Sequence, residues 1–123
     1  MIIRLRYKKW KKIIEKSGLF DVKYYLFTYP DVRLKDINPV MHYIKYGANE
    51  GRNPNKEFDT SFYLTNYSDV KESKMNPLVH YILYGRKENR IISSLKLEKN
   101  IAKQTKEQEL NQTKQNLQTK EQE

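Results

Sequence analysis

Cysteine is absent from this 123-residue sequence, which excludes a disulfide framework and thiolate chemistry. Histidine is scarce: His42 and His80 are the only two, whereas a zinc site takes three or four ligands. No glycine-rich phosphate loop, nucleophile elbow or Ser/His/Asp set is present either. The sequence therefore predicts no catalytic residues, no metal site and no cofactor, and we expect a protein that is not an enzyme.

Long apolar runs are also missing. None approaches the ~20 residues that a membrane-spanning helix needs. The basic start of the chain resembles the first part of a signal peptide, but no apolar core follows it. We expect a soluble, cytoplasmic protein.

Positive charge is concentrated at the N-terminus. Residues 1–17 carry seven Lys or Arg side chains against one carboxylate, Glu15, and the remainder of the chain is nearly balanced. A basic patch of this kind favours anionic partners such as phospholipid headgroups. The side chains that would contact such a surface are Arg4, Arg6, Lys8, Lys9, Lys11, Lys12 and Lys16.

Residues 2–16 have the pattern of an amphipathic helix. Ile3, Tyr7, Trp10 and Ile14 recur at helical spacing on one stripe, and Gly18 is suited to the left-handed C-cap. In one interpretation the stripe packs on the first repeat and the lysines stay solvated. In the other the helix lies on an anionic membrane. Nucleic acid is not an expected partner, because the single Trp belongs to the apolar stripe.

A 38-residue unit then occurs twice. Residues 20–52 align on residues 58–90 without a gap, and 16 of the 33 positions are identical. Such internal similarity indicates tandem repeats of one supersecondary unit. We predict an all-α fold with a basic helix (1–17), two helical-hairpin repeats (18–54 and 55–92) and a polar tail (93–123).

Each repeat reads as two short helices joined by a polar connection. An Asp caps the start of the first helix, and an Asn-Pro pair opens the second. Pro30 is predicted to end the first helix of repeat one. A glycine is predicted to cap the end of the second helix. The capping residues so assigned are Asp21, Asn38, Pro39 and Gly47 in repeat one and Asp59, Asn76, Pro77 and Gly85 in repeat two.

The second helix of each repeat also carries the candidate contact residues. His42 and Tyr46 stand four residues apart on one helical face, so they form either an internal hydrogen-bonded seam or a shallow polar groove. Arg52 is expected to tie the exit loop to a helix terminus. The candidate contacts for a partner protein or glycan are His42, Tyr46, Arg52, His80, Tyr84 and Arg90.

Beyond the second repeat the composition changes. Ile91 and Ile92 stand where repeat one has Asn53 and Pro54. They either fold back over the repeats or leave an apolar patch that promotes self-association. Residues 93–123 lack aromatic residues, and their heptad has one Leu where a coiled coil needs two apolar positions. We expect a solvated helix or disorder there.

Two stretches carry a family resemblance that spans residues 10–90. Residues 17–32 (SGLFDVKYYLFTYPDV) and 38–54 (NPVMHYIKYGANEGRNP) resemble the tandem helical repeats that accompany bacterial polysaccharide-biosynthesis glycosyltransferases and rhamnan-synthesis-type proteins. The second copy departs from the pattern at Ser68, at Asn89 and in the missing Asn-Pro.

The resemblance implies a non-catalytic interaction module, or the detached N-terminal part of a larger protein, in surface-polysaccharide assembly. Its partner would be a glycosyltransferase or another glycan-assembly protein, or a glycan. No Asp-x-Asp sugar-nucleotide signature is present. The alternative from the charge pattern is a peripheral protein held on the inner face of the cell membrane by residues 2–16.

Overall fold

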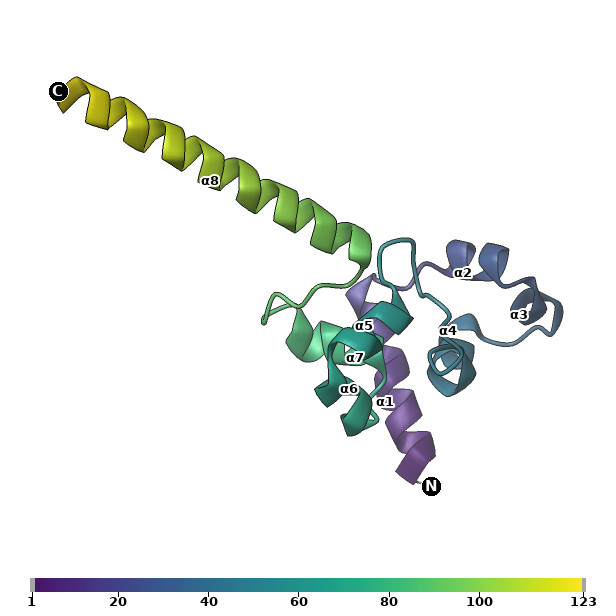
Figure 1. Ribbon diagram of the computed structural model, residues 1–123. Helices are drawn as coiled ribbons and strands as arrows, with labels where there is room; N and C mark the ends of the chain where they lie inside the picture. The colour runs from purple at the N-terminus through teal and green to yellow at the C-terminus, as the bar shows by residue number, and fades with distance from the viewer. Residues whose placement is uncertain (1, 123) are drawn as a thin grey trace. The chain divides into compact units, whose positions relative to one another are not determined.

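The computed structural model describes the backbone of residues 2–122 and the side chains of residues 3–117. All regular structure in that range is helical, so the all-α prediction is confirmed (Figure 1). The N-terminal helix is α1 (Ile2–Ser17). Repeat one holds α2 (Val22–Thr28), α3 (Pro30–Leu34), α4 (Pro39–His42) and the π-helix η1 (Tyr43–Gly47); repeat two holds α5 (Thr60–Asn66), α6 (Ser68–Ser73), α7 (Pro77–His80) and the π-helix η2 (Tyr81–Gly85). One compact unit extends as far as Ser93, and the last helix, α8 (Ser94–Gln122), is a second unit.

The two-helix description of each repeat is incomplete, because each copy contains a further helix, α3 or α6. The predicted second helix is one continuous run, since α4 passes directly into η1 and α7 into η2. Pro30 ends α2 as predicted, but it is also the first residue of α3, and Ser68 opens α6 at the matching position. A proline has no N–H to lose at the first position of a helix and has the backbone angle that the helix needs. Most of the predicted polar connection is therefore helical.

The predicted N-caps are confirmed. The Asp21 carboxylate accepts a hydrogen bond from the Tyr24 amide at 2.9 Å, and Asp59 and Asn38 make the equivalent bonds to their own helices. The Asn76 side chain accepts from two amides of α7. Gly18 follows the end of α1 with φ +72°, as predicted for a left-handed C-cap.

Gly47 and Gly85 are not C-caps. Each lies at the end of a π-helix whose next residue, Ala48 or Arg86, is still right-handed. A Cβ at Gly47 would overlap the Tyr25 hydroxyl, so glycine is needed there for space and not for its backbone freedom. The left-handed residue that follows each of these helices comes four positions later, at Gly51 and Asn89, with φ +76° and 57°.

The core is largely aromatic. Tyr25, Tyr43, Phe58 and Tyr63 are fully buried and meet at tilted or edge-on angles, which aromatic pairs favour. The apolar stripe of α1 packs on this core, with Ile14 completely buried. Helix α1 contacts α4 and η1 of repeat one and α7 and η2 of repeat two, so it joins both repeats and not the first alone.

Repeat two ends in the same way as repeat one. The amide of Ile91 donates to the Tyr67 hydroxyl at 2.7 Å, and the carbonyl of Ile92 accepts from the Asp59 amide at 2.9 Å. In repeat one the same bonds join Asn53 to Tyr29 and Pro54 to Asp21. Ile91 and Ile92 are half-buried, and the side chain of Ile92 packs on the core. They thus fold back over the repeat, the first of the two predicted alternatives.

Helix α8 has the character of a solvated helix. Its side chains are all exposed from Ser94 to Leu117, the last that the structure describes. Leu110 and Leu117, the heptad leucines, are more than half exposed. Across the described residues, no helix combines the length and the apolar character that crossing a bilayer requires.

Candidate functional site

The two histidines belong to internal hydrogen bonds. Nδ1 of His42 and the Tyr25 hydroxyl lie 2.8 Å apart, and His80 and Tyr63 repeat the bond at 2.7 Å. The imidazoles are only 7% and 8% exposed. Burial lowers the pKa of His42 and His80, and it raises the pKa of Tyr25 above its usual range. Each Tyr–His pair is therefore neutral at pH 7.

The predicted internal seam exists, but a different tyrosine makes it. Tyr46 and Tyr84 place their rings 5.7 and 5.5 Å from the imidazoles and do not hydrogen-bond to them. Both rings are about half exposed, at 55% and 50%. Sequence spacing pointed to the neighbour on the same helix, whereas the bond comes from α2 or α5, 17 residues earlier.

Each arginine of the exit loops holds a helix N-terminus, as predicted. The Arg52 guanidinium donates to both oxygens of Asp31, in the first turn of α3, at 2.8 and 2.9 Å. It also donates to Glu50 and lies over the Tyr29 ring. The bonds from Arg52 hold the pKa of Asp31 below its ordinary value.

Arg90 makes the same set of contacts with Asp69, Glu88 and Tyr67. Of the six candidate contact residues, both histidines and both arginines are thus engaged inside their own repeat. Tyr46 and Tyr84 are the two that present a large exposed area.

The basic side chains of α1 divide into two sets. Arg4, Lys8, Lys9, Lys12 and Lys16 are exposed, and Lys11 forms a 3.3 Å ion pair with Glu15. Arg6 instead turns toward repeat two, where it donates to the carbonyl of Lys74 at 2.7 Å and lies 4.2 Å over the Trp10 ring. Arg6 is the basic residue of α1 that reaches the space between the repeats.

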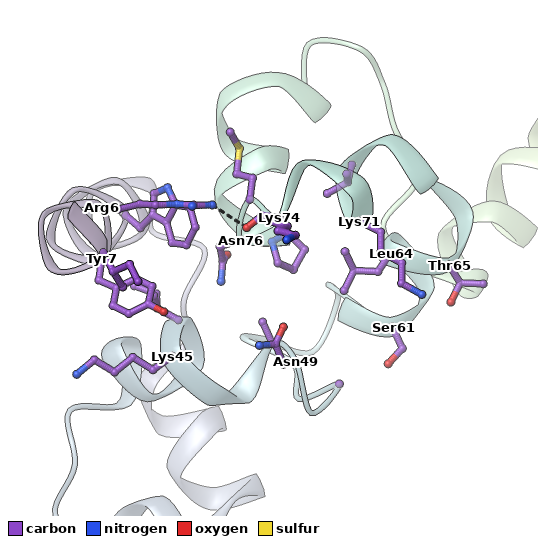
Figure 2. Close-up of a pocket in the computed structure, with 18 residues that line it drawn as sticks. Arg6, Tyr7, Lys45, Asn49, Ser61, Leu64, Thr65, Lys71, Lys74 and Asn76 are labelled. Atoms are coloured by element: carbon purple, nitrogen blue, oxygen red, sulfur yellow. Dashed lines mark hydrogen bonds between the residues drawn. The ribbon is translucent and has the colours of Figure 1, made fainter. Parts of the chain in front are cut away.

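That space is a groove of about 650 Å³ between α1 and the two repeats (Figure 2). Its walls come from α1, from η1 and the loop after it, and from α5, α6 and the start of α7. The apolar lining is Ile3, Tyr7, Trp10, Ile44, Ala48, Leu64, Val70, Met75 and Pro77, and the polar lining is Arg6, Lys45, Asn49, Ser61, Thr65, Lys71, Lys74 and Asn76.

The charge of the groove is entirely positive. Arg6, Lys45, Lys71 and Lys74 contribute four cations, and the described residues that line the groove include no Asp or Glu. Side chains of one sign on a concave surface concentrate ligands of the opposite sign. The groove therefore favours anions.

Asn76 lines the groove and is almost completely buried. Its Oδ1 accepts from the amides of Leu78 and Val79 at 3.0 and 3.2 Å, while its Nδ2 is buried and has no hydrogen-bond partner among the described residues. An unsatisfied buried donor costs about 1–3 kcal/mol. Figure 2 shows Asn76 among the lining residues, between Arg6 of α1 and Lys74 of repeat two. Asn76 was assigned from sequence as a cap only, and no sequence signal separated it from Asn38.

Among the side chains of residues 3–117 no three His, Asp or Glu are grouped so that they could hold a metal ion. Comparison with known proteins adds no relative: no protein-family model, no curated protein and no solved structure matches this chain.

Proposed function

We propose that this chain is a non-catalytic interaction module that binds a glycan in the groove between its repeats. The observation that carries the proposal is the groove itself, which needs α1 and both repeats to form. Its volume of about 650 Å³ lies within the range of small-ligand sites, roughly 300–1,000 Å³. Amides and hydroxyls beside aromatic rings suit a ligand with many hydroxyl groups and apolar C–H faces.

The titratable side chains support a binding role. General acid–base catalysis needs a side chain that can reach a substrate and exchange a proton with it. His42 and His80 are buried against tyrosines, and Asp31 and Asp69 are held by bidentate arginines. The groups that would be the first candidates for catalysis thus stabilise the scaffold.

The resemblance to polysaccharide-associated repeats supplies the setting. In that setting the protein works beside a glycosyltransferase or another glycan-assembly protein and holds part of the glycan. The proposed contact surface is the groove and not the helix face of His42 and Arg52. The polar side chains that line the groove include Asn49, Ser61 and Asn76.

The proposal is tested by titrating the ¹⁵N-labelled chain with short bacterial surface oligosaccharides, neutral and acidic. We expect the amide resonances of Asn49, Ser61 and Lys74 to shift in a saturable way. Those of Phe27 and Asp36, which do not line the groove, serve as internal controls. Failure of every oligosaccharide to shift the groove resonances would refute glycan binding.

A second candidate, binding to anionic membrane surfaces, is favoured by one observation. Six basic side chains of α1 are exposed on the same helix as Ile3 and Leu5, which are themselves more than 60% exposed. The rest of the apolar stripe, from Tyr7 to Ile14, packs on the core. Membrane binding in this form would be mainly electrostatic, with at most two apolar side chains inserted.

A further inference from the structure

We propose that the groove binds an oxyanion, a carboxylate or a phosphate, carried by a small polyhydroxylated ligand, with the buried Asn76 amide as a specific donor. This rests on the proposed function, because it assigns the chemistry of the ligand at the same groove. The site would include Asn76, Arg6, Lys45, Lys71 and Lys74.

The orientation of the Asn76 side chain is fixed by its own helix. Oδ1 accepts from two backbone amides of α7, so the oxygen faces the helix and the NH₂ group points away from it, in a residue that lines the groove. The residue is only 4% exposed, and Nδ2 has no partner among the described residues. A buried N–H donor calls for an acceptor, and an oxyanion is the strongest acceptor that a ligand can bring.

The surrounding charge selects for an anion. Four cations and no carboxylate line the groove. Arg6 uses one of its five N–H groups on the Lys74 carbonyl, which holds the guanidinium at the edge of the groove with donors to spare (Figure 2). Lys45, Lys71 and Lys74 are exposed and can follow the ligand.

The body of the ligand is indicated by the remaining walls. Asn49, Ser61 and Thr65 offer donors and acceptors on one side, and Tyr7 and Trp10 offer aromatic surface on the other. A volume of about 650 Å³ fits one or two sugar rings better than a folded partner.

Repeat one does not reproduce the site, although its backbone is equivalent. Asn38 caps α4 as Asn76 caps α7, but Asn38 is exposed. Arg33 stands at the position of Lys71, and Asp36 brings a carboxylate to the position of Lys74. The site therefore occurs once per chain, and repeat one supplies matched control positions.

The experiment uses the full ¹⁵N-labelled chain and four probes: glucuronate, glucose 1-phosphate, glucose and inorganic phosphate. Dissociation constants come from the chemical shifts of the groove amides, and the Asn76 side-chain NH₂ resonances report the donor directly. Asn76→Asp keeps the cap acceptor but removes the donor, and its control is Asn38→Asp. Lys71→Gln, at an exposed position, is compared with Arg33→Gln, so the test remains valid if Asn76→Asp fails to fold.

We expect glucuronate or glucose 1-phosphate to bind at least about tenfold more tightly than glucose, and whichever is tighter identifies the oxyanion. The Asn76 NH₂ resonances should shift on binding. Asn76→Asp should weaken binding by about tenfold or more and Lys71→Gln by about threefold, with both controls close to wild type.

Four results would overturn the inference. Equal affinities for glucose and for the anions would show that the oxyanion does not contribute to binding, while the proposal of glycan binding would stand. If inorganic phosphate binds as tightly as glucose 1-phosphate, the sugar ring does not contribute to the affinity, and the polyhydroxylated part of the proposal fails. Anion binding that persists unchanged in Asn76→Asp and shifts Lys8, Lys9 and Lys12 instead would reveal attraction to basic charge in general. If neither a sugar nor an anion binds, the inference and the glycan proposal both fail.

Discussion

The hydroxyl of Tyr25 occupies the space that a side chain at Gly47 would need, and Tyr63 stands in the same relation to Gly85. In both copies the hydroxyl also bonds to a buried imidazole, so it is fixed from two directions. The glycine is the last residue of the π-helix in each repeat, and its Cα lies against the tyrosine hydroxyl. Tyrosine, histidine and glycine thus act as one packed group in each repeat.

Substitution of Gly47 by Ala should lower the free energy of unfolding by about 1–3 kcal/mol, because the new methyl group overlaps the Tyr25 hydroxyl. Urea denaturation measures the loss. The double variant Gly47→Ala with Tyr25→Phe provides the control, since it removes the overlapping atom. It should be less destabilised than the sum of the two single variants. Additive losses would show that the hydroxyl is not the obstacle.

Stability should fall as the pH drops from 7.5 to about 5. The pKa of His42 and of His80 is lowered in the folded protein, so between the ordinary histidine pKa of 6.5 and the lowered values the unfolded chain binds more protons. The contribution is complete above pH 6.5 and is lost as the pH falls below it. Urea midpoints at pH 7.5, 6.5 and 5.5 test this.

The matched variant is His42→Gln with His80→Gln, in which the midpoint should change much less over the same range. The pKa values of Asp31 and Asp69 are lowered from 3.8, so these carboxylates contribute to a separate loss of stability only at more acidic pH. A wild-type midpoint that stays constant down to pH 5.5 would contradict the neutral Tyr–His pairs.

Ile92 should matter for folding, whereas α8 should not. Ile92→Asp places a charge against the core and should cost about 1–3 kcal/mol, measured by thermal or urea denaturation. Leu110→Asp, on the exposed surface of α8, is the control and should cost little. Truncation after Leu95 should leave the melting temperature of the repeats within about two degrees. Unfolding on truncation would show that α8 stabilises the repeats.

Binding to anionic vesicles, if it occurs, should be weak and sensitive to salt. The exposed cations of α1 would each contribute on the order of 1 kcal/mol near an anionic surface, and about 0.5 M salt should abolish the effect. Sedimentation with phosphatidylserine-containing vesicles measures it. Lys8, Lys9, Lys11 and Lys12→Glu should eliminate binding, whereas Ile3→Ser with Leu5→Ser should weaken it only slightly. Binding that survives high salt would indicate insertion of apolar side chains.

Caps could be predicted from the sequence because they depend on local geometry. The side chain of Asp21 or Asn38 needs only to reach an amide three residues ahead, and no distant part of the chain can change that. The structure after Pro30 was harder to predict. A proline ends the helix before it whether a loop or a new helix follows, so the sequence signal is the same in both cases. The five-residue helix that follows it is too short to show periodicity.

The groove could not be predicted, because its walls come from three segments far apart in the sequence. Asn38 and Asn76 have the same residue type and the same neighbouring proline, yet Asn38 is exposed and Asn76 is buried and lines the groove. Arg6 and Trp10 of α1 line the groove together with Asn76, whereas Asn38 is exposed and does not line it. Identical motifs thus acquire different environments through tertiary structure alone.

The bonds from Asp21 to Pro54 and from Asp59 to Ile92 bring the two ends of each repeat to one point. A duplication or deletion of one whole repeat in the gene would therefore join backbone positions that already stand next to each other. The chain would need no new path across the molecule to accommodate such a change. At the end of the second unit Ile91 and Ile92 take the places that Asn53 and Pro54 have in the first, and Ile92 packs on the core there.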